Sequence, residues 1–413
     1  VTGYISPTVE GLRITGGNSW NENGDGVYVV TATITISDCQ VIANMAGGPI
    51  PFHYNGGGVY LHSSANATLC GNIIQGNNEA SYGGGVYLHS SANATLCDNV
   101  IQYNATSGWY GTSGGGVYLN ESDNAMLSDN VILGNNTKYG GGVLLKDSAN
   151  ATLSDNIILS NTAKARIGSN GGGIYLINSA NPTLSGNTIQ GNWGNLGSGV
   201  SVSGSDNATL SANIIQGNRD VYGSCGGCSV HLSASANVAL DNNVIAGNQA
   251  GSGVCVEEST VVLRHTTLAR GVDCAGSGVH IWRNGSSVWL TNTILVSHAV
   301  GITVAAGNTV TLAATLWGTD TWANTNDWSG AGAINTGTHN YWGDPGFVDP
   351  DAGDYHIGPR SAARDVGLNT GVNSDIDGDL RPLGPGPDLG ADEYWPPGGF
   401  KYIFLPLVLQ KTP

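Results

Sequence analysis

The sequence is poor in charged residues, and most of those that it has are acidic. Charged residues make up 11% of the 413 residues, with 14 Lys and Arg against 30 Asp and Glu, which gives a formal net charge of −16. The basic residues are scattered singly, whereas a nucleic-acid footprint needs clustered Lys and Arg. The composition therefore excludes nucleic acid as an expected partner.

Long apolar runs, proline and cysteine are also scarce. No apolar run approaches the ~18 residues of a membrane-spanning helix, so no membrane span is predicted. Seven Cys are too few for a disulfide scaffold of this length. The 64 Gly have no period of three, which excludes collagen. A chain that starts at Val1, without Met, is expected to be a processed protein that is extracellular or on the cell surface.

What the sequence contains in abundance is an internal repeat. A Gly-Gly-Val-Tyr-Leu motif recurs along the chain, and in seven copies an Asn follows the motif's Val or Ile by 13 residues and a second Asn follows five residues later. The length varies between the second Asn and the next Gly pair. The first Asn residues are Asn72, Asn99, Asn130, Asn156, Asn187, Asn213 and Asn243. A constant unit with one variable loop is typical of stacked repeats.

Within a copy the apolar residues alternate with polar ones. Val59 and Leu61 are expected to face inwards, and Tyr60 and His62 outwards, which is the period of a β-strand. Three such short strands per copy cannot bury an apolar face alone, so the copies are expected to stack in parallel. The repeated Asn is expected at a left-handed turn, with its amide bonded to the Asn above and below.

The Ser-Ala-Asn-Ala-Thr-Leu rhythm of residues 64–69, with Gly-Gly-Gly-Val-Tyr-Leu, resembles the right-handed parallel β-helix proteins of the pectin-lyase-like superfamily, secreted bacterial ones in particular. The resemblance covers about residues 1–340. It implies an all-β fold, a right-handed parallel β-helix (β-solenoid) of about 11–12 coils with three strands per coil and a small C-terminal cap. That fold hosts lyases, hydrolases, adhesins and structural proteins, so it implies no single function.

Three regions follow from these patterns. Residues 1–340 form the predicted solenoid. Residues 341–395, which contain Asn-Tyr-Trp-Gly-Asp-Pro and Asp-Leu-Gly-Ala-Asp-Glu, resemble the segment after the solenoid in many such secreted proteins and are expected to cap it. Residues 396–413 are a Pro/Gly linker and an apolar tail strand, which resembles the terminal sorting or anchoring segments of some secreted bacterial proteins.

No catalytic residue is predicted, because the outward columns lack the acidic cluster that a β-helix lyase or hydrolase uses. The column Asp98, Asp129 and Asp155 is either a metal or sugar site or, as we favour, a set of turn residues. The late coils hold the densest group of titratable residues, which is either an active site or, as we favour, a set of paired charges. Glu258 is then expected to pair with Arg283, and Asp241 with Arg264.

Two groups of residues are candidate binding sites. A tyrosine column could stack sugar rings, or simply cover a sheet face; it comprises Tyr28, Tyr60, Tyr87, Tyr118 and Tyr175. Asn373, Asp375, Asp377 and Asp379 alternate as calcium ligands do, and either a loose calcium site or an Asx-rich turn explains them. Gly384 stands where an EF-hand needs Glu, which excludes that motif. Apart from calcium, no cofactor is predicted.

The cysteines suggest a few local disulfides. Cys70 and Cys97 stack one coil apart, and the remaining candidates are Cys225, Cys228, Cys255 and Cys274. We expect one to three disulfides, with Cys39 left as a thiol.

Two functions remain open. The main hypothesis is a secreted structural subunit that binds copies of itself head to tail in a filament or surface layer. The assembly residues would be Val1, Tyr4 and Ile5 at one end and Tyr402, Phe404, Leu405, Leu407 and Leu409 at the other. The alternative is a carbohydrate-binding or polysaccharide-degrading β-helix protein, or a tail-anchored adhesin, with polysaccharide as the partner.

Overall fold

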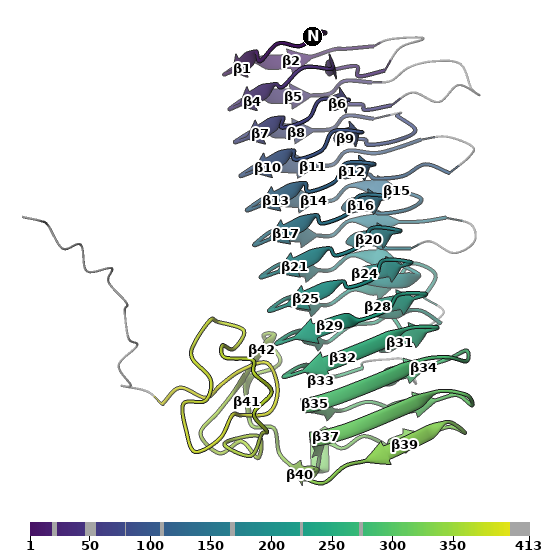
Figure 1. Ribbon diagram of the computed structural model, residues 1–413, viewed down its shortest axis with the longest axis vertical. Helices are drawn as coiled ribbons and strands as arrows, with labels where there is room; N and C mark the ends of the chain where they lie inside the picture. The colour runs from purple at the N-terminus through teal and green to yellow at the C-terminus, as the bar shows by residue number, and fades with distance from the viewer. Residues whose placement is uncertain are drawn as a thin grey trace, which may run out of the picture.

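The protein winds into a parallel β-solenoid in a computed structural model, with a smaller C-terminal segment beside its last coils (Figure 1). The structure describes residues 1–18, 23–45, 55–78, 80–107, 111–165, 170–223, 226–271 and 276–396. Each coil contributes one strand to a twelve-stranded sheet and, in most coils, two short strands to a second, angled sheet. The helix of the described chain is the 3-10 turn η1 (Asp320–Trp322), and no helix in those ranges is long and apolar enough to cross a membrane.

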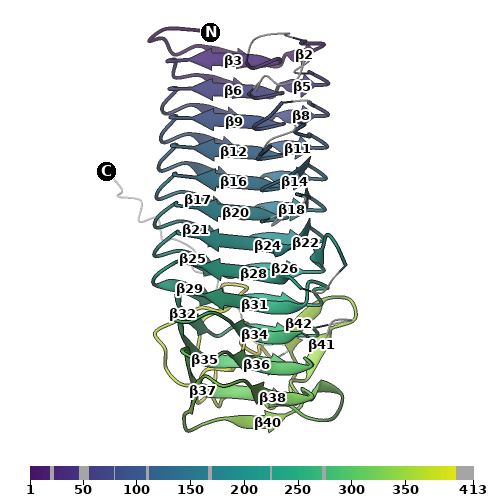
Figure 2. The ribbon, with the colours of Figure 1, turned by 90° about the vertical axis from the view of Figure 1, so that its right-hand side faces the viewer.

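The twelve-stranded sheet faces the viewer in Figure 2. Its strands pair in parallel, coil on coil, with Val59 opposite Val86 and Val86 opposite Val117. The strands are β3 (Val27–Val30), β6 (Val59–His62), β9 (Val86–His89), β12 (Val117–Asn120), β16 (Val143–Lys146), β20 (Ile174–Ile177), β24 (Leu196–Ser203), β28 (Cys228–Ser233), β31 (Ser252–Glu257), β34 (Ser277–Ile281), β36 (Val300–Val304) and β38 (Asn326–Ser329).

The second sheet has two rows of strands that meet at a corner. The first row is β1 (Thr8–Glu10), β4 (Thr35–Ser37), β7 (Thr68–Cys70), β10 (Thr95–Cys97), β13 (Met126–Ser128), β17 (Thr152–Ser154), β21 (Thr183–Ser185), β25 (Thr209–Ser211), β29 (Val238–Asp241), β32 (Thr260–Arg264), β35 (Ser287–Val296), β37 (Thr309–Gly318) and β39 (Ala333–Thr336). The second row is β2 (Arg13–Thr15), β5 (Gln40–Ile42), β8 (Ile73–Gln75), β11 (Val100–Gln102), β14 (Val131–Leu133), β18 (Ile157–Leu159), β22 (Thr188–Gln190), β26 (Ile214–Gln216), β30 (Val244–Ala246), β33 (Thr267–Ala269) and β40 (Tyr341–Gly343). The long strands β35 and β37 run through both rows.

Two small sheets complete the described chain. Four short strands form a parallel ladder in the variable loops: β15 (Asn136–Thr137), β19 (Thr162–Ala163), β23 (Trp193–Gly194) and β27 (Arg219–Asp220). The cap contains an antiparallel pair, β41 (Phe347–Asp349) and β42 (Asp354–Ile357).

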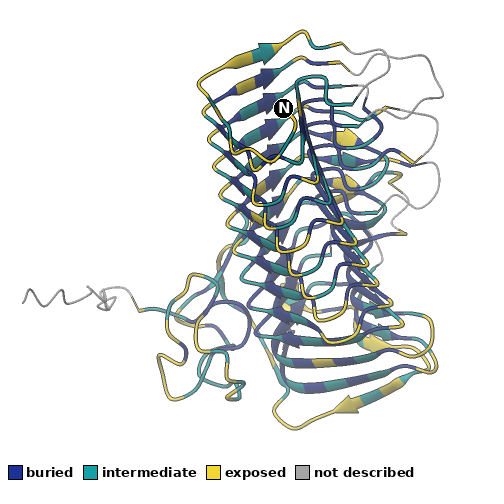
Figure 3. Ribbon diagram, turned by 45° about the horizontal axis from the view of Figure 1, so that its top comes forward, coloured by how far each residue is buried: buried dark blue, intermediate teal, exposed yellow. Residues whose placement is uncertain are grey.

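The interior is a stack of aliphatic columns. Val59, Leu61 and Leu69 are fully buried, and so are their counterparts in the neighbouring coils except Val27, which pairs with Val59 and is partly buried. Burial is concentrated inside the solenoid, and exposed positions lie mainly at the corners and ends (Figure 3). The alternation of inward and outward residues is therefore confirmed, because each coil supplies the same side-chain volume to the same place in the core.

The repeated Asn residues form two buried ladders inside the solenoid. Asn72 Nδ2 donates to Asn99 Oδ1 at 2.9 Å and to the Ile36 carbonyl at 2.9 Å, and the same bonds recur along the stack. The expected bonding between coils is confirmed. The expected left-handed backbone of these Asn is wrong, because the residue before each one turns the corner, as Asp98 does with φ of 54°. The side chain of the Asn then points inwards to bond the backbone of the neighbouring coils.

The Gly-Gly pair that precedes the motif's Val or Ile in several copies allows the coils to approach closely. A Cβ on Gly85 would lie 2.6 Å from the Gly116 carbonyl oxygen and 2.9 Å from Ile101 Cγ2. Contacts that short do not occur for real Cβ atoms, so any larger residue would push the coils apart. The Gly pair thus permits the close stacking of these coils, whereas Ser229 occupies the equivalent position before Val230.

Among the described residues, two disulfides join neighbouring coils. Cys70 is bonded to Cys97 and Cys228 to Cys255, whereas Cys39 is buried and forms no disulfide. Cys225 and Cys274 lie outside the described residues. Disulfides persist in oxidising compartments, which agrees with a protein outside the cytoplasm.

Candidate functional site

The tyrosine column stacks on the outer face of the twelve-stranded sheet. The rings of Tyr28, Tyr60, Tyr87 and Tyr118 follow one another with centroids 4.8–5.2 Å apart and planes within 11° of parallel. Because each ring face lies against the next, the three inner rings are 4–5% exposed. A sugar could therefore meet their edges and hydroxyl groups, and only Tyr28, which is 36% exposed at the end of the stack, is open enough to offer a ring face.

Leu144 interrupts the column, and Tyr175 resumes it on the next coil. A groove of about 490 Å³ runs over the four coils that contain Tyr87, Tyr118, Leu144 and Tyr175. We name it the tyrosine groove; its lining is Tyr82, Tyr87, Gly111, Ser113, Tyr118, Asn120, Tyr139, Leu144, Lys146, Tyr175 and Ile177. None of the described lining residues is Asp or Glu.

The hydroxyl groups of Tyr87, Tyr118 and Tyr175 in the groove stay protonated and can donate hydrogen bonds. Burial, followed by the neighbouring tyrosines, raises the pKa of Tyr87, and burial likewise raises the pKa of Tyr118. The same cause raises the pKa of Tyr60 to about 12. Tyr118 donates to Asn120 Oδ1 at 3.4 Å, and Tyr175 accepts from Asn170 Nδ2 at 3.3 Å. The groove is thus lined mainly by hydroxyl, amide and apolar groups, with Lys146 as the one charged side chain of its described lining.

Two residues that sequence reasoning missed form the side of this groove. Tyr82 lies across the column, with its ring 6.3 Å from that of Tyr87 and 5.8 Å from that of Tyr118. Tyr139 packs partly buried against the same cluster. Both stand immediately before a Gly-Gly-Gly or Gly-Gly run in a loop of variable length. That position was the signal available in the sequence, but only the stacking of the coils shows that these two side chains lie beside the tyrosine column.

The acidic residues of the outward columns occupy turns or form ion pairs with arginine. Asp98, Asp129 and Asp155 have φ of 54–57°, so they occupy the turns that were favoured for them. Arg264 forms two hydrogen bonds to Asp241 at 2.6 and 2.7 Å, as expected. Arg283 pairs at 3.1 Å with Glu257 and not with Glu258. Glu258 is at a left-handed corner with φ of 48°, so its side chain does not continue the column of Glu257.

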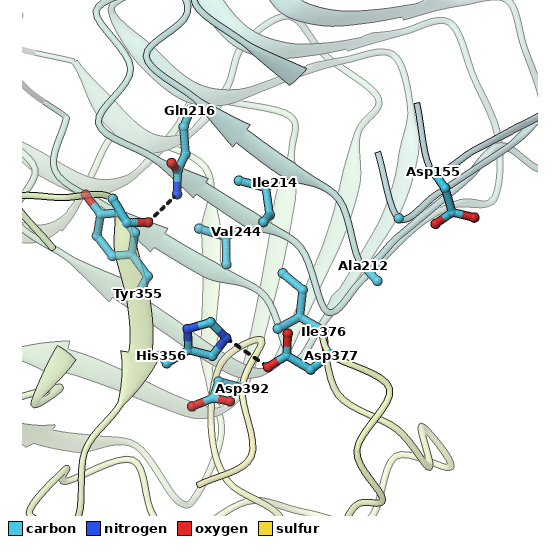
Figure 4. Close-up of a pocket in the computed structure, with 12 residues that line it drawn as sticks. Asp155, Ala212, Ile214, Gln216, Val244, Tyr355, His356, Ile376, Asp377 and Asp392 are labelled. Carbon is cyan, nitrogen blue, oxygen red and sulfur yellow. Dashed lines mark hydrogen bonds and ion pairs between the residues drawn. The ribbon is translucent and has the colours of Figure 1, made fainter. Parts of the chain in front are cut away.

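A second pocket, of about 330 Å³, lies between the cap and the second row of strands (Figure 4). His356 on β42 reaches Asp377 through Nε2 at 2.9 Å and Asp354 through Nδ1 at 2.6 Å. Asp392 lies beside this pair and accepts a hydrogen bond from the Ile357 amide at 2.7 Å. The hydrogen bond to Asp377 is the main cause that raises the pKa of His356 to about 10.

The four residues predicted as a calcium loop differ in their surroundings. Asp375 is buried, and its carboxylate accepts from the amides of Asp377, Asp379 and Glu393. The carbonyl of Asn373 accepts from the Arg381 amide. Of the four, Asp377 is the one that lies next to other metal-ligating side chains, namely His356 and Asp392. Binding of calcium by this loop stays a prediction.

The cap is bound to the solenoid through a buried histidine. His265 Nδ1 lies 3.2 Å from the Asp388 carbonyl, and a carbonyl can only accept, so Nδ1 carries the hydrogen. Nε2 then accepts from Asn292 Nδ2 at 2.9 Å. Burial, together with the nearby charge of Arg381, lowers the pKa of His265 to about 3. The imidazole is neutral, and its bonds require it to remain so.

Acid is therefore expected to loosen the cap. The usual pKa of His265 is 6.5 and the folded value is about 3, so the unfolded state takes up the proton first. The stability of cap docking should fall as the pH decreases from about 6.5 towards 3. Hydrogen exchange of residues 344–396 at several pH values measures this loss.

The comparison variant is His265→Asn, since Asn tolerates the φ of 47° at this position. Burial raises the pKa of the Asp388 and Glu393 carboxyl groups, so their protonation makes the cap more stable as the pH falls. Because both proteins contain these carboxyl groups, the difference between wild type and variant removes their contribution. The variant should lose less protection than the wild type between pH 6.5 and 4. If the wild type and His265→Asn lose protection in parallel as the pH falls, His265 is not the group responsible. The same conclusion follows if His339→Asn, at an exposed site, changes the loss of protection as much as His265→Asn does.

The assembly residues predicted at the N-terminal end are exposed: Tyr4 is 97% exposed, and Val1 and Ile5 about half. Their predicted partners Tyr402, Phe404, Leu405, Leu407 and Leu409 lie outside the described residues. Head-to-tail assembly therefore stays a prediction.

The parallel stacking of repeated coils places the chain in the class of parallel β-helix repeat proteins. The sequence profile of the family described as "Right handed beta helix region" matches residues 8–195 and 141–316, and the chain belongs to that family. The sequence matches none of the curated proteins with which it was compared.

Three solved structures illustrate the likeness. Tailspike protein 2 of Escherichia coli O157:H7 bacteriophage CAB120 has 11% identity and a TM-score of 0.43 over 71% of this chain, which spans 42% of the tailspike chain. The A-module of mannuronan C-5 epimerase AlgE6 of Azotobacter vinelandii has 13% identity and a TM-score of 0.40, covering 82% of this chain and 91% of that one. Pectate lyase Pel9A has 12% identity and a TM-score of 0.40, covering 82% and 88%. Values this low bear on neither substrate nor activity.

Proposed function

We propose that the protein binds polysaccharide chains non-covalently in the tyrosine groove, outside the cytoplasm. The observation that carries the proposal is the groove itself, which extends over four coils and combines aromatic edges with hydroxyl and amide groups. Sugars present C–H faces to aromatic rings and hydroxyls to polar groups, so a mixed lining suits them. An elongated groove parallel to the solenoid axis favours a chain-like ligand over a compact one.

The lining supports binding more than cleavage. Glycoside hydrolysis uses two carboxyl groups on either side of the scissile bond. The described lining of the groove offers neither, and Lys146 is its one charged side chain. Glu121, which accepts from Asn120 Nδ2 at 3.5 Å, is beside the groove but does not line it. A chain bound there would be held without an acid and base pair.

Alanine substitution of Tyr82 and Tyr139 tests the proposal. Both contribute to the side of the groove and neither belongs to the stacked column, so their removal should weaken binding while the solenoid stays folded. We expect at least about tenfold weaker affinity for each variant, equivalent to about 1.4 kcal/mol. Isothermal titration against polygalacturonate, alginate and neutral glucans measures the affinity, and chromatography of the mixture detects cleavage.

The matched control is Tyr103→Asn. Tyr103 is exposed on another face, and Asn accepts its φ of 53°. This variant should bind like the wild type. If none of the polysaccharides binds, or if the Tyr82 and Tyr139 variants bind as well as the control, the groove is not the site. Depolymerisation that is lost in Arg264→Ala or Arg283→Ala would instead indicate an enzyme that acts in the late coils.

A further inference from the structure

We propose that His356, Asp377 and Asp392 bind a divalent transition-metal cation, with Zn²⁺ as the best match, which joins three segments of the cap. One ligand atom from each residue lies within 4.8 Å of the others. His356 comes from β42, Asp377 from the turn after residue 373, and Asp392 from the last part of the cap. The site is independent of the tyrosine groove, which is on a different sheet.

The histidine is already oriented as a metal ligand. Asp354 Oδ1 holds His356 Nδ1 at 2.6 Å, and this leaves Nε2 directed at Asp377 (Figure 4). A carboxylate on the far nitrogen is the usual companion of a metal-bound histidine, since it sets the ring orientation and raises the basicity of the ligating nitrogen. Asp354 would hold this second-sphere position.

Asp392 is placed to act as the second carboxylate ligand. Its side chain is 7% exposed, and one carboxylate oxygen accepts from the Ile357 amide at 2.7 Å. Within the described ranges no donor bonds its other oxygen. That oxygen is open to the pockets on which Asp392 lies, where a cation could reach it. The backbone bond meanwhile holds the carboxylate in place.

The donor set selects the class of cation. One imidazole nitrogen with two carboxylate oxygens suits zinc and related first-row metals, whereas calcium and magnesium prefer sites made only of oxygen. Zn²⁺ takes such ligands at about 2.0–2.2 Å, so its ligand atoms are up to about 4 Å apart. When a metal replaces the proton on His356 Nε2, the carboxylates of Asp354, Asp377 and Asp392 are left with three negative charges, which a divalent cation would largely offset.

The surroundings leave room for the ion to enter. The three residues line both the pocket of about 330 Å³ towards the solenoid and a second pocket of about 380 Å³ on the other side. A bound ion would link residues that are 15 to 36 positions apart in the sequence. Because these links close loops in the cap, the metal should stabilise the cap against local opening.

Titration with Zn²⁺ alone, followed by calorimetry, tests the proposal on the full chain. We expect one Zn²⁺ per chain, at least tenfold weaker binding in Asp377→Asn, and a loss between about 10-fold and 100-fold in Asp354→Asn. Asp377 is exposed, so its variant should fold. Hydrogen exchange of residues 344–396 with and without Zn²⁺ is the second readout, and the metal should slow exchange in the wild type but not in Asp377→Asn.

The control is Asp379→Asn, which changes the same turn but none of the three ligand residues, and it should bind Zn²⁺ like the wild type. Equal Zn²⁺ affinity in the wild type and Asp377→Asn would place the ion elsewhere and overturn the proposal. Preferred binding of Ca²⁺, weakened equally by Asp377→Asn and Asp379→Asn, would also overturn it and assign the cation to residues 373–379. Neither outcome affects the polysaccharide proposal, which is tested on other residues.

Discussion

Replacing Arg381 with Ala is expected to unfold the C-terminal cap and leave the solenoid folded. Arg381 is 5% exposed, lies 3.2 Å from Glu393, and donates to the carbonyls of Asp388, Gly390 and Ala391 at 2.8–3.3 Å. Truncation would leave Glu393 as a buried charge without its cation. Breaking a buried pair from one side costs about 3–5 kcal/mol. A cap of this size is expected to lose its structure after that loss.

Burial is the main cause of the pKa shifts at this pair, lowering the pKa of Arg381 and raising that of Glu393 to about 6. Both directions show that the charges are costly to hold inside the cap and that each depends on the other. Loss of the pair should free Tyr355, Ile357 and Leu389 from the apolar surface of β30 and β35 on which they pack.

Hydrogen exchange and limited proteolysis measure the effect by region. Residues 344–396 should exchange and be cleaved rapidly in Arg381→Ala, whereas the coils from β3 to β24 should match the wild type. Arg360→Ala, at an exposed site in the same cap, is the control and should change neither. The double variant Arg381→Met with Glu393→Gln removes both charges and should recover part of the protection. Uniform loss of protection through the solenoid would contradict the expected independence of the cap.

Asn156→Ala is expected to be among the most destabilising single substitutions inside the solenoid. Asn156 Nδ2 donates to Asn187 Oδ1 at 3.0 Å and to the Leu127 carbonyl at 2.8 Å. Its Oδ1 accepts from the amide and the Nδ2 of Asn130 at 3.0 and 2.9 Å. All these groups are buried, and each one left without a partner costs about 1–3 kcal/mol. We expect a loss of about 4 kcal/mol or more in the free energy of unfolding.

The matched control is Asn150→Gly in the exposed Asn ladder at the corner of the same coil. Asn150 Nδ2 donates to Asn124 Oδ1 at 3.1 Å, and its Oδ1 accepts from Asn181 Nδ2 at 2.9 Å. Water can replace these bonds, and Gly accepts the φ of 57°. Its loss should stay below about 1 kcal/mol. Urea denaturation followed by circular dichroism compares the two, and similar losses would show that burial does not set the value of the ladder.

The solenoid could be predicted because its information is local and repeated. A period of two in residues 59–62 determines which side chains face the core, and the constant interval to Asn72 and Asn77 determines where each coil turns. Stacking then follows, since a coil cannot bury its apolar face alone. The wrong prediction of a left-handed backbone at the Asn residues has the same origin. The local pattern located a corner correctly, but the residue with the left-handed conformation is the one before each Asn.

The candidate sites could be predicted only in part, because they depend on contacts between residues distant in sequence. The tyrosine column was visible as a repeated position, yet the burial of its ring faces follows from the spacing of the coils, and Tyr82 and Tyr139 reach it from loops whose lengths vary. The partner of Arg283 was misassigned by one residue for a similar reason, since a left-handed corner redirects Glu258.

The sequence by itself determined the repeat, the parallel β-solenoid, the buried columns and the absence of clustered basic charge. Each of these follows from the spacing of residue types along the chain. The tertiary structure alone decided that Cys228 bonds Cys255, that His265 joins the cap to the solenoid, and that His356 and Asp392 meet Asp377. The physical reason is that the cap does not repeat: its contacts depend on how one irregular segment folds back on the sheet, which no period in the sequence encodes.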